Sequence, residues 1–390
     1  MDDSINDSPA SAAELAELVA SANRDRVPLV IAGNRSKLDW GGIVTGTNRI
    51  VSTRKLDRLI AHAVGDLTVT VEAGMPFVRL QAVLATAGQF LPLDPVYPDR
   101  ATIGGIIATA NTGSLRHRYG GVRDLLLGIS FVRADGKIAK AGGRVVKNVA
   151  GYDMMKLFTG SYGTLGILTE VTLRVYPQPT NLGTVIITGA IDRLEQAAQI
   201  LLASTLTPIA ADVVSTALSQ QLELSNTPSL VIKFATIPAS IAEQSAQLLD
   251  IAKGLGLKAG IWQGTQSENL WSGIQTKIWG ERPIGCKLGV RLTAAVATIA
   301  TLDRLTDNTA PGVIHLNSGI GACALSNAKP ISPLRSQCEA SGGFLSVLQA
   351  PVEVKQHIDV WGYRGNTLPL MKQIKQQFDP LGILNPGKCF

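Results

Sequence analysis

The chain has 390 residues, of which 45% are hydrophobic, 17% charged and 5% aromatic, and its formal net charge is +6. These values exclude a disordered or fibrous protein and indicate a globular chain of two domains. The cationic residues are scattered and are not interleaved with aromatic ones, which argues against nucleic-acid binding and favours an anionic small molecule or an acidic partner.

The N-terminal residues and the cysteines bear on the cellular compartment. The chain opens Met1-Asp2-Asp3, acidic where a secretory or transit peptide would be basic, and it has no long apolar run that could span a membrane. We therefore expect a cytoplasmic protein without an integral membrane segment. The four cysteines form no C-x-x-C pair, so we expect reduced thiols rather than a disulfide framework, a zinc site or an iron–sulfur cluster.

The first hundred residues predict alternating helices and strands. Helical spacing of apolar residues predicts helices over 12–23, 53–63 and 76–88, with Pro76 in a first turn and Gly88 just after a last one. Short apolar or alternating runs predict strands over 28–32, 50–51 and 67–72. The opening part of the chain is therefore mixed α and β.

Glycines concentrate over residues 101–166, which hold thirteen of the 39 in the chain. Such a density of residues without a Cβ indicates that something approaches this backbone closely. Asp135-Gly136 predicts a hairpin between strands over 125–132 and 137–139, and 168–175 alternates like a strand. We place a domain boundary in the Pro177-Gln178-Pro179 stretch that follows.

The pattern beyond that boundary alternates strands with helices. The predicted strands are 184–188, 229–235, a strand at Ile261, 287–292, 313–318 and 344–348. The predicted helices are 192–204, 240–255, 298–305, 332–340 and, in the tail, 368–378. This order predicts one antiparallel sheet with helices on one face.

Three glycine-bearing segments could hold a ligand. Residues 33–37 offer a glycine, successive N–H groups, a hydroxyl and two cations that suit a diphosphate, but they match neither G-x-G-x-x-G nor a P-loop, and a plain surface turn is the favoured alternative. Residues 92–114 contain glycine pairs and polar groups that suit a flat ring or pyrophosphate, with a glycine-rich structural core as an equal alternative. Together with residues 160–167, they suit one long ligand better than three separate turns.

Six motifs in this order resemble the FAD-linked oxidases of the vanillyl-alcohol oxidase, or PCMH, type. The motifs are Gly33–Lys37, Ala101–Gly105, Tyr119–Asp124, Gly143–Tyr152, Gly160–Ile167 and Ile383–Lys388. Within that family the chain is most similar to the FAD-binding subunits of glycolate oxidase (glycolate dehydrogenase), through Val146–Asp153 and Val360–Gly362. The resemblance covers almost the whole chain and is densest over 28–178 and 358–390.

The resemblance implies an α+β fold with three parts. Residues 1–178 would form a PCMH-type FAD-binding domain of two subdomains, and residues 179–355 a ferredoxin-like cap that carries the substrate. Residues 356–390 would pack back on the FAD-binding domain.

The resemblance also assigns residues to the cofactor. The FAD pyrophosphate would contact Gly33, Asn34, Arg35, Ser36 and Lys37. The ribityl and isoalloxazine region would be lined by Pro92, Asp94, Thr102, Gly104, Gly105, Gly113 and Ser114. The adenosine side would be held by Gly160, Ser161, Gly163, Gly166 and Ile167, with Asn385 and Lys388 closing over the flavin. Members of the family often bind the flavin covalently through a histidine in the first loop, and since none lies at 33–37 we expect non-covalent FAD.

The implied reaction is oxidation of a 2-hydroxy acid, which needs a cation for the carboxylate and a base for the hydroxyl proton. Strand alternation places Lys287 and Arg291 on one face, where they could meet a carboxylate, although two solvated cations are the commoner case. His315 could be the base. The four histidines have no metal-ligand spacing, so we predict no metal site and read each histidine first as structural or exposed.

Two hypotheses about function follow. In the first, the chain is an FAD-containing subunit that oxidises glycolate and passes electrons to an acceptor other than oxygen, together with a sister flavoprotein subunit and an iron–sulfur subunit, through which it could sit at the inner face of a membrane. In the second, the chain binds FAD, or merely keeps the fold, while a sister subunit performs the oxidation.

Overall fold

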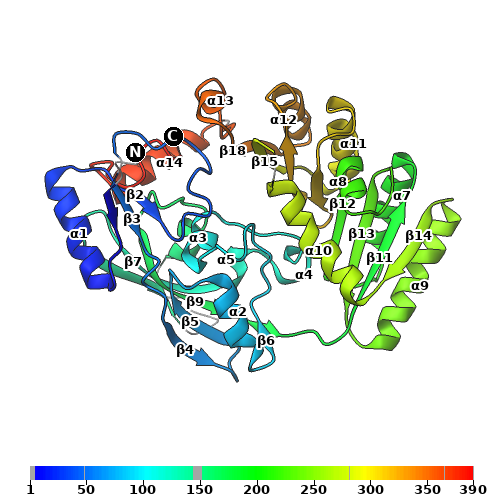
Figure 1. The fold of residues 1–390 in the computed structure, drawn as a ribbon, viewed down its shortest axis with the longest axis horizontal. Coiled ribbons are helices and arrows are strands. Elements are labelled where there is room, and N and C mark those ends of the chain that lie inside the picture. Colours follow the sequence, from blue (N-terminus) through cyan, green and yellow to red (C-terminus); the bar gives the residue numbers. More distant parts are fainter. Residues whose placement is uncertain (1–4, 48, 144–151, 281, 364, 390) are drawn as a thin grey trace. The chain divides into compact units, whose positions relative to one another are not determined.

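The structure of the chain is a computed structural model, which describes residues 5–47, 49–143, 152–280, 282–363 and 365–389. It divides into two compact units (Figure 1). Residues 1–112, 120–178 and 363–390 form the first, and residues 113–119 and 179–362 form the second. Most of the Val146–Asp153 motif lies outside the described residues.

The first unit begins with a short parallel sheet and a helix. Strands β1 (Ile5–Asp7), β3 (Arg49–Ser52) and β2 (Val30–Ala32) pair in that order. Helix α1 (Ala12–Asp25) starts where predicted, because the hydroxyl of Ser11 accepts a hydrogen bond from the Glu14 N–H, and its buried face carries Leu15 and Val19.

The second sheet of this unit has five antiparallel strands. Their spatial order is β4 (Leu59–Ala63), β5 (Thr68–Glu72), β9 (Ile167–Arg174), β7 (Leu126–Val132) and β8 (Ile138–Gly142). The predicted hairpin at Asp135-Gly136 is confirmed, since it joins β7 to β8. The predicted helix over 53–63 is wrong: residues 59–63 pair with β5, and the ladder outweighs the helical spacing of the apolar residues.

Short elements complete the unit around this sheet. The helices are α2 (Phe77–Ala85), α3 (Ile103–Ala108), α5 (Val122–Leu125) and α6 (Met154–Phe158), and a small ladder joins β6 (Gln89–Phe90) to β10 (Tyr176–Pro177). Pro76 is the N-cap residue of α2 rather than part of its first turn. The side chains of α2, α3, β5 and β9 share one apolar core.

The C-terminal tail returns to the first unit. Helix α14 (Thr367–Phe378, red in Figure 1) confirms the helix predicted over 368–378, and the tail beyond it runs beside β2. The N–H of Leu29 donates to the carbonyl of Ile383 at 2.7 Å, and the N–H of Asn385 donates to the carbonyl of Leu29 at 3.0 Å. In the division of the chain into compact units, the returning tail comprises residues 363–390.

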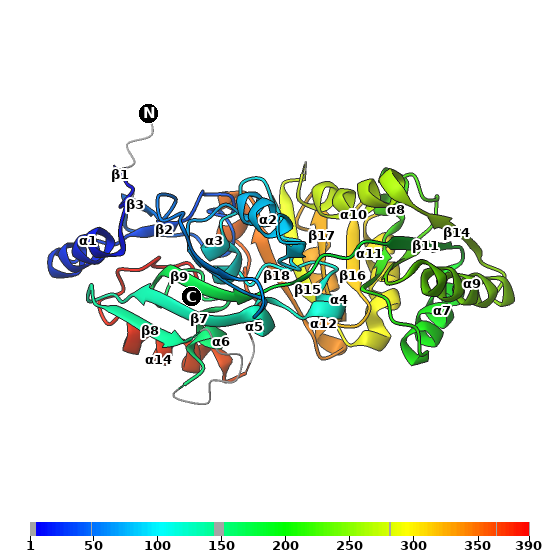
Figure 2. The same cartoon turned by 90° about the horizontal axis from the view of Figure 1, so that it is seen from below.

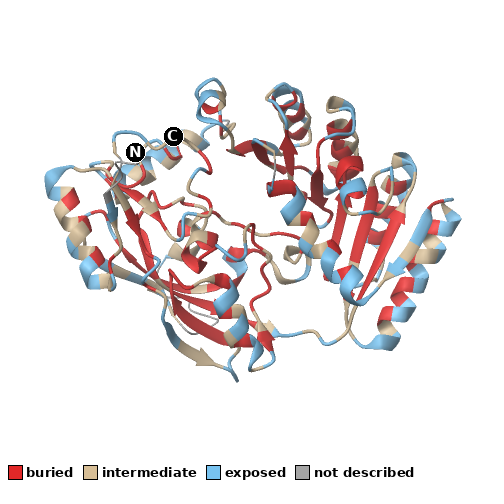
Figure 3. Cartoon of the chain, viewed as in Figure 1, coloured by how far each residue is buried: buried red, intermediate tan, exposed pale blue. Residues whose placement is uncertain are grey.

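The second unit is built on one antiparallel sheet, as predicted from its alternating strands and helices. In spatial order the strands are β14 (Lys258–Trp262), β11 (Leu182–Thr188), β13 (Ser229–Ala235), β12 (Ala210–Val214), β16 (Gly312–His315), β17 (Ile320–Leu325), β15 (Ile284–Gly289) and β18 (Phe344–Gln349). The central strands are buried (Figure 3). Strands β12 and β17 were not predicted, because neither sequence alternates clearly between apolar and polar residues.

Helices cover both faces of this sheet, so the prediction of helices on one face is wrong. One face packs against α7 (Ile191–Ala203), α9 (Pro238–Gly254), α11 (Ala295–Leu305) and α12 (Ile331–Ala340). Helices α7 and α9 lie side by side (Figure 2). The other face meets α10 (Gly264–Trp279) and α4 (Arg116–Tyr119), which contact β17 and β12. The remaining elements are α8 (Thr216–Gln221), η1 (Leu292–Ala294) and α13 (Val352–Gln356).

Asp379 fixes the tail to the first unit. Its carboxylate is 1% exposed and accepts hydrogen bonds from the N–H groups of Ile383 (3.0 Å) and Leu384 (2.7 Å). It also contacts the ammonium of Lys375 at 2.5 Å. One buried carboxylate thus holds the turn that brings the last residues back to β2.

Replacing this carboxylate tests its contribution to stability. Asp379→Asn should lower the free energy of unfolding by about 3 kcal/mol, because a buried ammonium loses its counter-charge. Urea denaturation measures the change. The control is Asp66→Asn, at an exposed side chain, which should change stability by less than about 0.5 kcal/mol. Equal stability of Asp379→Asn and the control would contradict this role.

Candidate nucleotide-binding site

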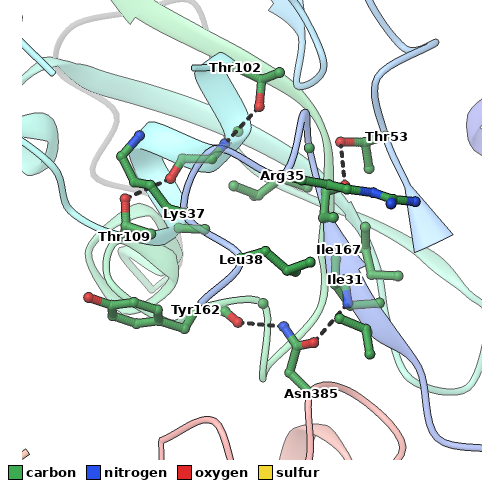
Figure 4. A pocket seen from close by; sticks show the side chains of 18 of the residues that line it. Ile31, Arg35, Lys37, Leu38, Thr53, Thr102, Thr109, Tyr162, Ile167 and Asn385 are labelled. Carbon is green, nitrogen blue, oxygen red and sulfur yellow. Dashed lines mark hydrogen bonds between the residues drawn. The ribbon is translucent and has the colours of Figure 1, made fainter. Parts of the chain in front are cut away.

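A pocket opens in the first unit where four separate segments meet (Figure 4). Its walls come from β2 and the loop after it, from α3, from the loop before β9, and from the tail. The predicted residues that line it are Gly33, Asn34, Arg35, Ser36, Lys37, Thr102, Gly104, Gly105, Ser161, Gly163, Gly166, Ile167, Asn385 and Lys388. The structure therefore brings together the three glycine-bearing segments and the tail.

The loop after β2 offers backbone donors to a ligand. Among the described residues, the N–H groups of Asn34, Arg35, Ser36 and Lys37 have no hydrogen-bond acceptor. Arg35 has φ +56°, in the left-handed region, and a left-handed residue in a turn can direct successive N–H groups toward one side. Its guanidinium instead reaches Asn6, so this loop offers its backbone rather than the Arg35 charge.

Lys37 adds a buried charge to this loop. Its side chain is 8% exposed, and its ammonium has no hydrogen-bond partner in the described part of the chain. Burial and the nearby Arg100 guanidinium lower the pKa of Lys37 to about 8. A buried ammonium without an acceptor is costly, and an anion in the pocket would remove that cost.

The tail closes another side of the pocket. The side-chain oxygen of Asn385 accepts the N–H of Ile31 at 2.7 Å, and its side-chain nitrogen donates to the carbonyl of Tyr162 at 2.7 Å (Figure 4). The ammonium of Lys388 donates to the carbonyl of Leu38 at 2.6 Å. These contacts link the tail to the loop after β2 and to the loop before β9.

The two central glycines of α3 have different roles. A Cβ at Gly104 would lie 2.9 Å from the carbonyl oxygen of Ala73, so this glycine allows the helix to approach β5. A Cβ at Gly105 would meet only the Thr102 hydroxyl, at 3.1 Å, and would otherwise enter the pocket. Gly105 therefore leaves room for a ligand, whereas Gly104 serves packing.

The other predicted cofactor residues do not line this pocket. Pro92, Asp94 and Gly160 lie elsewhere in the first unit, and Gly113 and Ser114 belong to the second. Ser114 hydrogen-bonds to Asp212 there. Pocket residues that the sequence analysis missed include Thr53, Thr109 and Tyr162. The sequence around Thr53, Thr109 and Tyr162 contains no motif that predicts a pocket position, because strands and turns distant in the sequence bring these residues together.

The predicted catalytic residues all lie in the second unit. Lys287 is in β15 and His315 in β16, whereas β15 ends at Gly289, so Arg291 is not on the strand as predicted. Arg291 is exposed and precedes η1, near Gly342. Within the described ranges, no group of three or more His, Cys, Asp or Glu side chains is placed to hold a metal ion.

Comparison with known families identifies the class of protein. The FAD binding domain family matches residues 7–142, and the C-terminal domain of FAD linked oxidases matches residues 361–389. Both matched stretches contribute residues to the pocket. These two matches show that the chain carries the FAD-binding domain and the C-terminal domain of FAD-linked oxidases, and they support FAD binding, as the six motifs predicted.

Individual relatives narrow the comparison. Glycolate oxidase subunit GlcE of Escherichia coli (strain K12) is 42% identical over 166 residues, which are 42% of this chain and 47% of that protein. Glycolate oxidase subunit GlcD of Bacillus subtilis (strain 168) is 33% identical over 192 residues, 49% of this chain and 40% of that protein. The chain thus spans less than half the length of each of these relatives.

A solved structure shows the same fold. The structure of p-cresol methylhydroxylase with substrate bound superposes with a TM-score of 0.74 over 98% of this chain and 88% of that one, at 14% identity. The predicted α+β fold class of the PCMH-type oxidases is confirmed.

The pocket residues fit the diphosphate of FAD. That group is a flexible dianion that needs several donors. The loop supplies the N–H groups of residues 34–37 and the ammonium of Lys37, none of which has a hydrogen-bond acceptor among the described residues. Gly105 leaves space beside them. Non-covalent binding of the flavin stays a prediction.

The titration of Lys37 gives a prediction about FAD affinity. With a pKa of about 8 in the free protein, Lys37 is charged at neutral pH and loses its proton above that value. Bound diphosphate favours the charged form, so FAD affinity should fall about tenfold between about pH 7 and about pH 9. Fluorescence titration of the apoprotein measures this.

Variants of Lys37 supply the control for that titration. Lys37→Met should bind FAD about tenfold or more weakly at neutral pH and should lack this fall at alkaline pH. Lys55→Met, at an exposed lysine of the same unit, should behave like the wild type. An unchanged pH dependence in Lys37→Met would contradict the placement of the diphosphate.

Substitution at Gly105 tests the space for the flavin. Gly105→Val should reduce the FAD content of the purified protein about tenfold or more, with little change in thermal stability, because its side chain enters the pocket. Gly104→Val should instead destabilise the unit, since the branched side chain meets Ala73. Gly65→Val, which enters open space, is the control. Full FAD content in Gly105→Val would disprove the placement.

Proposed function

We propose that the chain is the FAD-containing subunit of a complex that oxidises a small 2-hydroxy acid, such as glycolate, to the corresponding 2-oxo acid. The observation that carries the proposal is the diphosphate-binding loop with its buried Lys37, in a chain 42% identical over 166 residues to a glycolate oxidase subunit. The electrons pass to an acceptor other than oxygen.

The residues of this chain bind and orient the two reactants. Bound FAD supplies an acceptor for two electrons and a hydrogen. The loop at residues 34–37 and the ammonium of Lys37 balance the charge of its diphosphate, while Asn385 holds the pocket wall together. The polar residues of the second unit, Lys287 and His315 among them, bind the acid and take its proton.

Partners complete the activity in this proposal. Glycolate oxidase subunits GlcE and GlcD are both similar to this chain, which supports assembly with a sister flavoprotein subunit. An iron–sulfur subunit would carry the electrons onward, on the cytoplasmic side of a membrane. None of the helices in the described part of the chain is long and apolar enough to cross a membrane.

The second candidate function is an FAD-binding subunit without its own oxidation step. It is favoured by Arg291, which is exposed and follows the end of β15, so it does not share a strand face with Lys287 as expected for a pair that binds a carboxylate. In this case the chain would support a catalytic sister subunit.

Anaerobic reduction separates the two candidates. The purified chain with bound FAD, absorbing near ~450 nm as oxidised flavins do, is mixed with glycolate or, as the control, with acetate, which lacks the hydroxyl. Bleaching of the purified chain by glycolate, but not by acetate, supports the proposal. Bleaching only after the sister subunit is added supports the second candidate, and no bleaching in either preparation contradicts both.

A further inference from the structure

Three polar side chains share one face of the sheet in the second unit. Asp212 in β12 lies directly opposite His315 in β16, and Val313 is aligned with Ala322, which is aligned with Lys287 in β15. Residues opposite each other, and residues two apart, point to the same face of a sheet. Asp212, His315 and Lys287 therefore share a face.

The opposite face of these strands is apolar. The neighbours of the polar residues, including Ala211, Ile314 and Leu288, belong to the core that packs against α7, α9, α11 and α12. The polar residues are thus confined to the face that meets α4 and α10. This segregation makes them one group rather than scattered surface charges.

The segment at residues 113–119 covers this polar face. Its helix α4 contacts β12, and the side-chain nitrogen of Asn317 donates to the carbonyl of His117 at 2.6 Å. The hydroxyl of Ser114 lies 2.5 Å from one carboxylate oxygen of Asp212. These contacts place Arg116 and His117 above the sheet.

The buried carboxylate of Asp212 accepts hydrogen bonds from both Ser114 and His315. Its other carboxylate oxygen lies 2.8 Å from Nδ1 of His315, and the exposed fractions of Asp212 and His315 are 0% and 3%. A carboxylate only accepts hydrogen bonds, so Nδ1 of His315 carries the hydrogen and Nε2 is the ring nitrogen that can take a proton. Asp212 thereby sets the orientation and the tautomer of His315.

Arg116 and Lys287 are two cations on the same face of the sheet as Asp212 and His315. In the part of the chain that the structure describes, the side chains of Arg116 and Lys287 make no hydrogen bond or ion pair. Burial and, to a lesser extent, the charge of Arg116 lower the pKa of Lys287 to about 8. Like charges held together without an anion repel, so this arrangement favours an anionic ligand.

His117 adds an unsatisfied polar atom to the group. Its Nδ1 is buried without a hydrogen-bond partner among the described residues. Burial lowers the pKa of His117, which opposes the effect of Asp212, while His315 lowers it further. A neutral imidazole near Asp212 and His315 can donate to, or accept from, a polar ligand.

We propose that these residues form a recognition site for a small 2-hydroxy carboxylate. Arg116 and Lys287 bind the carboxylate, and Nε2 of His315 accepts the hydroxyl hydrogen. Ser114 and Asp212 are positioning residues that orient His315 without touching the acid. The identity of the ligand as a hydroxy acid rests on the proposed function, whereas the binding of a small carboxylate rests on the cluster alone.

Binding without turnover tests the site. Oxalate carries two carboxylates and no hydrogen that can be removed, so its binding to the FAD-loaded chain is independent of oxidation. The chain has only four histidines, which can be followed separately by NMR after labelling. Oxalate should shift the resonances of His117 and His315 and leave those of His62 and His357 unchanged. Shifts of neither His117 nor His315 would overturn the proposal.

Charge-removing variants locate the carboxylate. Calorimetry should show that Arg116→Met and Lys287→Met each weaken oxalate binding about tenfold or more. Arg118→Met on the same helix and Lys258→Met on the same sheet, both at exposed positions, are matched controls and should bind like the wild type. Equal effects of the controls, or no effect of Arg116→Met and Lys287→Met, would overturn the assignment.

Asp212→Asn tests the positioning role. In the assembled complex it should lower the maximal rate of flavin reduction by glycolate about tenfold or more, and it should change the glycolate concentration for half-maximal rate less than about threefold. A rise in that concentration at an unchanged rate would overturn the role. Should Asp212→Asn not fold, Ser114→Ala provides the same test with a smaller effect of the same kind.

The two proposals can fail separately. If oxalate binds as described while glycolate never bleaches the flavin, the recognition site stands and the proposed oxidation fails. If glycolate bleaches the flavin while His117 and His315 do not respond to oxalate, the oxidation stands and this site is wrong.

Discussion

A buried ammonium that has no hydrogen-bond acceptor among the described residues is the constraint on which the rest of the first unit depends. Lys37 is such a group, and it lies beside a run of backbone N–H groups that also lack acceptors. Within the described residues, folding gives the ammonium a cation–π contact with the Trp40 ring at 5.7 Å but no hydrogen-bond acceptor, and it gives the N–H groups no acceptor. The fold therefore reserves these donors for an anion, and a diphosphate has the oxygens and the charge to engage them.

The C-terminal tail makes this arrangement stable. Asp379 holds the turn after α14, and Asn385 then bridges β2 to the loop before β9 through its single side-chain amide. Asn385 is more than two hundred positions from both Ile31 and Tyr162 in the sequence, and its one amide group sets the spacing between them. This explains why two family matches at opposite ends of the chain describe parts of one site.

The sequence predicted features that depend on local chemistry. Three such features depend on residues that are adjacent in the sequence, and the structure contains them where expected. They are the helix cap at Ser11, the hairpin at Asp135-Gly136 and the donor-rich loop at 33–37. That distant segments meet at one ligand was predicted only from the resemblance to a family, because no local pattern reveals it.

Other features depend on tertiary contacts and were missed. Residues 59–63 have helical spacing but pair with β5, and β12 lacks a pattern because both of its faces are buried. No local pattern joins Asp212 to Ser114, since they meet only where residues 113–119 pack on the sheet of the second unit. Ser114 was expected near the flavin, but in the structure its hydroxyl hydrogen-bonds to Asp212.

Amide hydrogen exchange at residues 34–37 tests the central claim most directly. These N–H groups have no acceptor in the described ranges of the chain, so binding of the FAD diphosphate should slow their exchange about tenfold or more. Riboflavin, which carries the same ring system without phosphate, should leave their exchange unchanged. Equal protection by riboflavin and FAD, or no protection by FAD, would contradict the account.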